Sequence, residues 1–253
     1  MDRRVLQKIL ETAELSPEDI VIEVGPGLGV LTEALIARAK RVIAVELDRG
    51  LALALRQALP RAEVIEGDIL SFTPLQLLGA SLPYKVVANI PYNITSPLLR
   101  HFLEAELPPR LMVIMVQREV GEAIVAKPGD LGLLALSVQF YSRPRLVARV
   151  PARSFYPPPQ VGSALLRLEV YDQPAVAVQD RAAFFRIIRA GFSAPRKQLH
   201  NSLAQGLKLE SETASQLLQE AGIDPRRRAE TLSLEEWSQV YHDFSAQEVA
   251  IAS

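Results

Sequence analysis

The chain has 253 residues, of which 49% are hydrophobic and 23% are charged, and it contains no cysteine. This composition excludes a disordered, collagen-like or coiled-coil protein, and the lack of cysteine excludes disulfides, thiolate nucleophiles and Cys-ligated metals. Because no apolar stretch is long enough to span a membrane and no secretory signal opens the chain, we expect a cytoplasmic protein without metal.

The net charge of −1 argues against a nucleic-acid partner, but it is the sum of three unequal parts. Residues 1–142 carry 14 basic and 17 acidic residues, residues 143–209 carry 11 and 3, and residues 210–253 carry 3 and 9. A basic middle part predicts a surface that neutralises phosphates, although a solvated helix face is the simpler interpretation of a charge run. The candidate RNA contacts are Arg186, Arg189, Arg196 and Lys197, with Arg226 and Arg227 further along.

Short β-rich runs alternate with helical patterns as far as Gln117. Strands are predicted at 20–24, 41–46, 62–66, 85–89 and 111–116, and helices at 28–39, 51–59, 74–78 and 96–105. This alternation is typical of a doubly wound α/β domain with a mostly parallel sheet.

The pattern changes after Gln117. Apolar runs predict strands at 134–140 and 145–150, joined by residues 142–144, and a last alternating strand at 161–170. Helices are predicted at 180–192, 196–206, 211–221 and 233–244. A boundary near residue 173 then gives one domain at 1–173 and an all-helical domain at 174–253.

The first candidate site is the turn Glu23–Gly29, between a predicted strand and a predicted helix. Glycines at Gly25 and Gly27 let a ligand approach the backbone, and a helix N-terminus offers free N–H groups. Val30 stands where a dinucleotide-binding turn has its third glycine, which disfavours a nicotinamide cofactor.

Two carboxylates follow the next two predicted strands. Glu46 is placed to accept from both hydroxyls of a ribose, and Asp68 to accept from the amino group of an adenine. Because the carboxyl ends of these strands converge on one crevice, the set predicts a site for a ligand that contains a nucleoside. The alternative is a tight turn with two solvated carboxylates.

The second candidate site is the segment Asn89–Tyr92, at the end of the fourth predicted strand. The exocyclic amine of adenine is a poor nucleophile, because its lone pair is delocalised into the ring. An Asn carbonyl and a backbone carbonyl that accept its N–H groups would favour a pyramidal nitrogen. Pro91 stiffens the turn, and Tyr92 offers a ring on which a flipped base can stack. The segment predicts methylation of an adenine amine, unless it is only a proline turn that ends a strand.

Together these segments resemble the adenine N6-dimethyltransferases of ribosomal RNA, whose cofactor and target-base motifs have the same order and spacing. Further segments, at 115–120, 127–129, 154–161, 196–199 and 227–233, are similar to the bacterial small-subunit branch of that family. The resemblance covers nearly the whole chain. It implies a Rossmann-like class I methyltransferase fold, with an antiparallel edge to the sheet and a small helical C-terminal RNA-binding domain.

The resemblance also implies roles for individual residues. The ligands of S-adenosyl-L-methionine would be Glu23, Gly25, Gly27, Glu46, Leu47, Asp68, Ile69 and Asn89. The target adenine would be handled by Asn89, Ile90, Pro91, Tyr92 and Phe155. Asn89 would hold the amino group, and Phe155 would close on the face of the base opposite Tyr92.

The sequence departs from the family pattern in two places. Members usually carry a Gln-x-Phe-Leu segment before the first helix, whereas here Met1 is followed almost directly by Val5–Leu10. Truncation, a late start codon or a different mode of cofactor binding would each account for this, and cofactor affinity is the property affected. Gly162 stands where the family more often has Asp, and nothing in the sequence explains that change.

The function implied by the resemblance is dimethylation of two neighbouring adenosines in the 3′-terminal hairpin of small-subunit (16S) ribosomal RNA. The partner would be an immature small ribosomal subunit, and the enzyme is expected to be a monomer. Three alternatives stay open: an antibiotic-resistance enzyme that methylates large-subunit RNA, a non-catalytic assembly factor, and a small-molecule methyltransferase. The segments at 155–159 and 227–233 favour the small-subunit enzyme.

Overall fold

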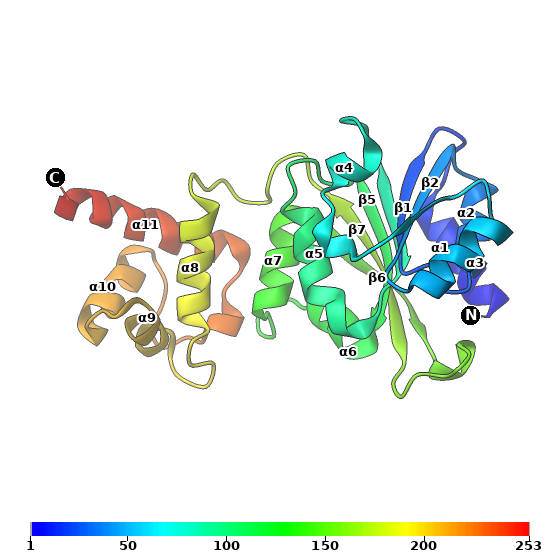
Figure 1. Cartoon of the computed structure of the whole chain (residues 1–253). Helices are drawn as coiled ribbons and strands as arrows, with labels where there is room; N and C mark the ends of the chain where they lie inside the picture. The colour runs from blue at the N-terminus through cyan, green and yellow to red at the C-terminus, as the bar shows by residue number, and fades with distance from the viewer. Residues whose placement is uncertain (1, 253) are drawn as a thin grey trace. The chain divides into compact units, whose positions relative to one another are not determined.

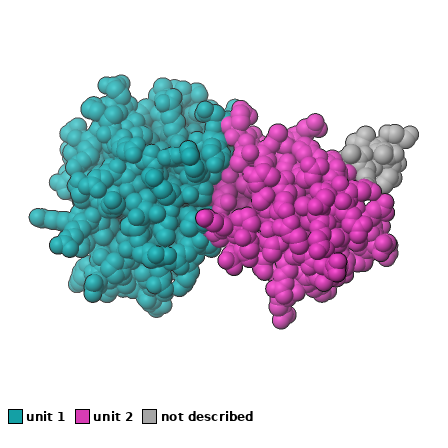
Figure 2. All heavy atoms as spheres, turned by 180° about the vertical axis from the view of Figure 1, so that it is seen from behind, with its two compact units in different colours: residues 1–125, 141–172 teal, residues 126–140, 173–253 magenta. Residues whose placement is uncertain are grey.

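The computed structural model of the chain describes residues 2–252, with the side chains described as far as residue 245. The chain divides into two compact units, which Figure 2 distinguishes by colour. Unit 1 comprises Met1–Val125 and Tyr141–Asp172, and unit 2 comprises Ala126–Phe140 and Gln173–Ser253. The division expected from the sequence, 1–173 and 174–253, differs from this in residues 126–140 and in residue 173, which belong to unit 2.

Unit 1 is built on a seven-stranded sheet with the order β3-β2-β1-β4-β5-β7-β6. Its strands are β1 (Ile20–Val24), β2 (Arg41–Glu46), β3 (Glu63–Glu66), β4 (Lys85–Asn89), β5 (Leu111–Gln117), β6 (Ser142–Val150) and β7 (Ser163–Val170). The first five strands pair in parallel, whereas β7 is antiparallel to both β5 and β6. The predicted doubly wound, mostly parallel sheet with an antiparallel edge is therefore confirmed.

Helices cover both faces of this sheet, and Figure 1 shows α1 and α2 on one side and α5 and α6 on the other. The helices of unit 1 are α1 (Arg3–Ala13), α2 (Val30–Ile36), α3 (Arg49–Ala58), α4 (Pro74–Leu78), α5 (Thr95–Leu103) and α6 (Arg118–Ile124). Ile9 of α1 and Leu35 of α2 join one core cluster with Val113 and Met115 of β5. On α6, a Cβ at Gly121 would overlap Ala164 of β7, so that helix packs closely on the sheet. Because helices cover both faces of the sheet, the sequence of β5 is a nearly continuous run of apolar residues.

The order of the strands reverses beside β1, which lies between β2 and β4. In open α/β sheets, ligands bind outside the carboxyl ends of the strands at such a switch point. The segments that follow β1, β2, β3 and β4 are the ones in which the sequence predicts cofactor and base contacts.

Unit 2 is helical. Its helices are α7 (Leu133–Tyr141, whose last residue belongs to unit 1), α8 (Arg181–Gly191), α9 (Leu199–Leu207), α10 (Ser211–Glu220) and α11 (Leu234–Ala252). Trp237 and Tyr241 of α11 are both buried in its core. A Cβ at Gly191 would overlap the ring of Trp237, so α8 requires a glycine there.

The prediction of a strand at 134–140 is wrong, because this segment is helix α7. Apolar and polar residues alternate through Leu136, Ser137, Val138, Gln139 and Phe140, which imitates the two-residue period of a strand. In the helix, Leu136, Val138 and Phe140 are all buried, so buried apolar side chains project from most of its circumference. Residues 142–144, predicted to join two strands, instead begin β6.

Two further helices, α1 and α6, were not among the predicted elements, although apolar residues recur in α1 at helical spacing. Within the part of the chain that the structure describes, no helix is long and apolar enough to cross a membrane.

Candidate functional site

The turn after β1 contains three glycines in the left-handed region, at φ values of +64° for Gly25, +56° for Gly27 and +80° for Gly29. A Cβ at Gly27 would meet no other atom within 4 Å, so the backbone here faces open space. A Cβ at Gly29 would instead lie 2.6 Å from Leu55 Cδ2. Gly27 therefore leaves room for a ligand, whereas Gly29 allows α2 to pack against α3.

Glu46, the last residue of β2, holds this turn in place. Its Oε2 accepts a hydrogen bond of 3.0 Å from Gly27 N–H, and its Oε1 accepts one of 3.0 Å from Asp48 N–H. The side chain is buried. Since each carboxylate oxygen has a further lone pair, Glu46 can still accept from the hydroxyls of a ligand.

Glu23 is a buried carboxyl inside β1, two residues before Gly25. It is 1% exposed, and its Oε2 has no hydrogen-bond partner. Burial, together with a smaller contribution from the charge of Glu46, raises the pKa of Glu23 from an ordinary 4.5 to about 8. An unsatisfied buried oxygen beside an open glycine turn is a position where a ligand's donor group can be accommodated.

The raised pKa of Glu23 predicts that the protein loses stability as pH rises from about 4.5 to about 8, because only the folded state keeps this proton in that window. Relative to Glu23→Gln, whose amide does not titrate, the wild type should lose up to about 1.4 kcal/mol of unfolding free energy per pH unit. Urea unfolding of both proteins between pH 5 and 8 measures this. Parallel pH profiles would show that Glu23 is ionised throughout.

The segments after β2 and β3 complete the crevice. Gly67 N–H donates to Glu46 O at 2.9 Å, which joins the ends of the two strands, and Asp68 accepts from Leu70 N–H at 3.0 Å at the start of the short helix η1 (Ile69–Ser71). Ile69 is buried, whereas Leu47 is 73% exposed.

These residues fit S-adenosyl-L-methionine. Carboxylates at two strand ends can accept from its hydroxyl and amino groups, and an exposed leucine beside them offers an apolar contact for a flat base. The orphaned oxygen of Glu23 and the open space at Gly27 leave polar and steric room for the rest of such a ligand.

The segment Asn89–Tyr92 lies beside this crevice. Asn89 ends β4 with an exposed side chain, while Ile90 is buried and donates from its N–H to Met115 O at 3.1 Å. A Cβ at Gly25 would lie 3.6 Å from Pro91 Cδ, so the glycine turn passes directly against this segment. The structure thus brings together two motifs that lie far apart in the sequence.

A cavity of about 310 Å³ is lined by both this segment and the proline-rich loop, residues 155–159. Its lining residues are Asn89, Ile90, Pro91, Tyr92, Phe155, Tyr156, Pro157 and Pro159. Phe155 packs against the core of unit 1, whereas Tyr156 is 93% exposed. All five residues predicted to handle the target base line this one cavity. Tyr156 and the two prolines were missed, although an aromatic residue next to Phe155 was visible in the sequence.

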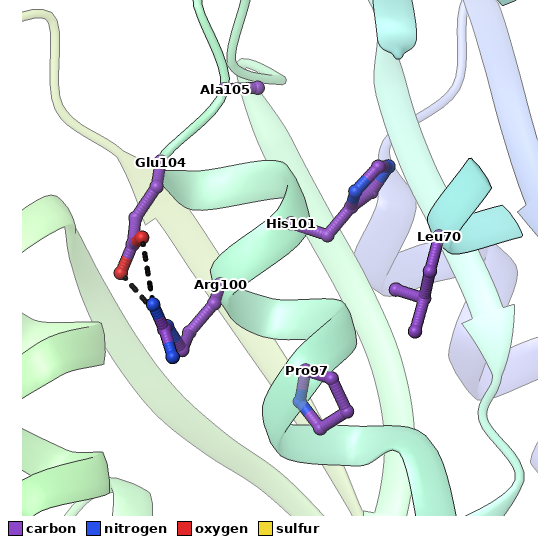
Figure 3. A pocket seen from close by; sticks show the side chains of 6 residues that line it. All are labelled: Leu70, Pro97, Arg100, His101, Glu104 and Ala105. Atoms are coloured by element: carbon purple, nitrogen blue, oxygen red, sulfur yellow. Dashed lines mark hydrogen bonds and ion pairs between the residues drawn. The ribbon is translucent and has the colours of Figure 1, made fainter. Parts of the chain in front are cut away.

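A second cavity, of about 350 Å³, lies between α5 and η1 (Figure 3). Figure 3 shows His101 projecting from α5 toward Leu70, and Arg100 paired with Glu104 on the same helix. Burial lowers the pKa of His101, which favours its neutral form. None of the residues predicted for the site lines this cavity, although Leu70 directly follows Ile69.

The six predicted RNA contacts all belong to unit 2, but they have different surroundings. Arg186, Arg189, Arg196 and Lys197 are exposed, and the Arg226 side chain is 80% exposed. Arg227 is less exposed, at 31% of its side chain: it is paired with both oxygens of Glu236 and donates to Thr231 O at 2.7 Å. Its guanidinium holds the pKa of Glu236 below the ordinary value.

This difference predicts opposite effects for neighbouring arginines. Arg227→Ala should lower the free energy of unfolding by roughly 1–3 kcal/mol, because it removes charge-assisted hydrogen bonds that are only partly exposed. Arg226→Ala should change it by less than about 0.5 kcal/mol, and should instead weaken RNA binding and its salt dependence. Thermal unfolding and RNA binding at several salt concentrations separate the two outcomes. Equal loss of stability in both variants would contradict this assignment.

Comparison with known proteins identifies the family of this chain. The family model of the ribosomal RNA adenine dimethylases matches residues 1–245. A ribosomal RNA small subunit methyltransferase A from Dehalococcoides mccartyi is 55% identical over 236 residues, which are 92% of this chain and 81% of that protein. One from Pelotomaculum thermopropionicum is 44% identical and covers 96% of this chain and 88% of that protein.

Solved structures agree as well. The 23S rRNA methyltransferase ErmE aligns with a TM-score of 0.74 at 29% identity, over 97% of this chain and 98% of its own. A dimethyladenosine transferase from Plasmodium falciparum aligns with a TM-score of 0.82 at 23% identity, over 98% and 97%, and this likeness concerns the fold. With a family match over nearly the full length, and relatives identical at about half of the aligned positions, the chain belongs to the ribosomal RNA adenine dimethylase family.

Proposed function

We propose that this protein uses S-adenosyl-L-methionine to dimethylate the N6 atoms of two adjacent adenosines in the 3′-terminal hairpin of 16S ribosomal RNA, as part of small-subunit assembly. The observation that carries the proposal is the position of Asn89–Tyr92, which lines a cavity and lies against the glycine turn at Gly25. The target amine and the methyl donor would then occupy neighbouring spaces in unit 1.

The chemistry requires little acid or base catalysis from the protein. When bound, S-adenosyl-L-methionine supplies a methyl group on a positively charged sulfur, which is already an activated electrophile. Asn89 presents a side-chain carbonyl that can accept from the adenine amine, and a backbone carbonyl nearby can accept its second N–H. These two bonds orient the nitrogen lone pair, so that the main contribution of the protein is positioning.

The aromatic residues of the cavity would hold the base outside its RNA stack. Tyr92 offers a ring, and Phe155 belongs to the other chain segment that lines the cavity. Stacking on aromatic rings is worth about 1–3 kcal/mol per base and suits a base that has been flipped out. Unit 2 would contribute the phosphate contacts, through Arg186, Arg189, Arg196, Lys197 and Arg226.

Glu46, Asp68 and the glycine turn would hold the cofactor, with Leu47 and Ile69 beside its adenine. We further propose that the enzyme acts as a monomer in the cytoplasm, where its RNA substrate is assembled into ribosomes.

A second candidate function is methylation of large-subunit RNA, which the likeness to the 23S rRNA methyltransferase ErmE favours. The small-subunit assignment is better supported, because relatives named for the small subunit are 55% and 44% identical whereas ErmE is 29% identical.

The experiment that tests the proposal compares the two ribosomal subunits as substrates. Under-methylated small subunits and large subunits are incubated separately with the protein and methyl-labelled S-adenosyl-L-methionine. We expect label in the small-subunit RNA alone. Label in the large-subunit RNA would support the second candidate, and label in neither would contradict both.

A further inference from the structure

One hydrogen bond connects Tyr92, in the lining of the cavity, to the sheet. The hydroxyl of Tyr92 lies 2.9 Å from Ser163 Oγ, and either group can be the donor. Tyr92 belongs to the segment after β4, whereas Ser163 is the first residue of β7 and directly follows the proline-rich loop. The bond therefore joins two segments that are 71 residues apart in the sequence.

Ser163 is a rigid anchor for this bond. It is 1% exposed, and it pairs with Gln117 of β5 on one side and with Val150 of β6 on the other. The preceding carbonyl, of Gly162, accepts from Arg118 N–H at 3.0 Å. A residue that is buried between two strands has little freedom to follow a movement of the cavity wall.

Tyr92 has fewer constraints of its own. It lies on the three-residue helix η2 (Tyr92–Ile94) and is half-buried. Apart from the bond to Ser163, its carbonyl accepts from Thr95 Oγ1 at 3.3 Å, which holds the backbone and not the ring. Among the described residues, Ser163 is the one hydrogen-bond partner of the Tyr92 side chain that we identify, so this bond helps to set the orientation of the ring.

We propose that Ser163 is a positioning residue for Tyr92, fixing its ring as the stacking surface for the target adenine. This inference rests on the proposed function, since it concerns how the same cavity holds its base. Without the bond, the ring can tilt away from the other chain segment that lines the cavity, which contains Phe155. The base would then be held less tightly in the geometry that both methyl transfers require.

The second methyl transfer is the step most sensitive to this loss. After the first transfer the amine carries one methyl group and one hydrogen, so only one N–H remains to be accepted. Stacking then carries a larger share of the binding of the base. A looser ring should raise the proportion of monomethylated adenosine among the products.

The test uses the full chain with the variants Ser163→Ala, Tyr92→Phe and the double variant, assayed on under-methylated small subunits. Matched controls are Ser142→Ala, a buried serine at the other end of the β6–β7 pair, and Tyr84→Phe, which removes the hydroxyl that donates to Leu107 O at 2.9 Å. Measurements are KM for RNA, the affinity for S-adenosyl-L-methionine, the ratio of monomethyl to dimethyl product, and the thermal unfolding midpoint.

We expect Ser163→Ala and Tyr92→Phe each to raise KM for RNA or the monomethyl fraction by about 3- to 10-fold, which is the effect of losing one net hydrogen bond. The double variant should add no more than about 2-fold, because both substitutions remove the same bond. Cofactor affinity, and every property of the two controls except stability, should be unchanged.

The inference is overturned if Ser163→Ala folds and methylates like the wild type, or if the two single effects multiply in the double variant. It is also overturned if the two controls show the same changes in KM or product ratio at an equal loss of thermal stability. Should Ser163→Ala fail to fold, Tyr92→Phe decides alone, since it retains the ring. A wild-type protein without activity on small subunits would be the failure of the proposed function instead.

Discussion

Asn89→Ala should lower the rate of methylation by at least about 100-fold, the usual scale for the loss of a positioned hydrogen-bonding group at a reacting atom. Asn89 ends β4 with an exposed side chain and lines the cavity beside the glycine turn. Alanine removes the carbonyl that orients the adenine amine, but leaves the stacking rings and the exposed arginines of unit 2 in place. Binding of RNA should therefore stay near the wild-type value.

The measurement is single-turnover methylation with labelled S-adenosyl-L-methionine, alongside equilibrium binding of the same RNA. Asn201→Ala, in helix α9 of unit 2, is the matched control and should methylate normally. Retention of full activity by Asn89→Ala would show that Asn89 does not orient the adenine amine. A parallel loss of RNA binding would show that Asn89 is needed for more than the chemical step.

The second large effect is expected from charge reversal in unit 2. Arg196 and Lys197 are exposed just before α9, and the only side-chain partner of Lys197 that we identify among the described residues is Gln205, at 3.5 Å. Reversal of both to Glu should weaken RNA binding on the order of 10- to 100-fold at low salt. It should also reduce the slope of log affinity against log salt by about 1.4–1.8, because two phosphate contacts are lost.

A control with the same change in charge is Lys40→Glu combined with Arg61→Glu, both exposed in unit 1. This variant should retain the salt slope of the wild type, and both variants should bind S-adenosyl-L-methionine normally. Equal weakening of RNA binding in the two variants would indicate that only the net charge matters. Loss of cofactor binding in the first would indicate that the two residues support the fold.

Much of unit 1 could be predicted because buried parallel strands leave a local signal. The predicted bounds of β1, β2 and β4 agree with the structure, and glycine or a polar residue follows each of these apolar runs. Helix α7 could not be predicted in this way, since a helix that is buried around most of its circumference has no polar face to set a 3.6-residue period.

The same distinction between local and tertiary signals applies to the residues of the candidate site. Motifs at the ends of strands, such as Glu46 and Asn89, could be found in the sequence because chain order and fold place them at one edge of the sheet. Contacts between distant segments could not. The pairing of Arg227 with Glu236 and the bond between Tyr92 and Ser163 depend on tertiary packing that leaves no local pattern.

The central claim is that this protein dimethylates two adjacent adenosines of small-subunit RNA, and mapping the methylated bases tests it most directly. Under-methylated small subunits are treated with the wild-type protein or with Asn89→Ala, and the RNA is digested and its modified nucleosides located by mass spectrometry. We predict two neighbouring N6,N6-dimethyladenosines in the 3′-terminal hairpin with the wild type and neither with the variant. Methylation at a single isolated adenosine, at another part of the RNA, or equally with both proteins would contradict this account.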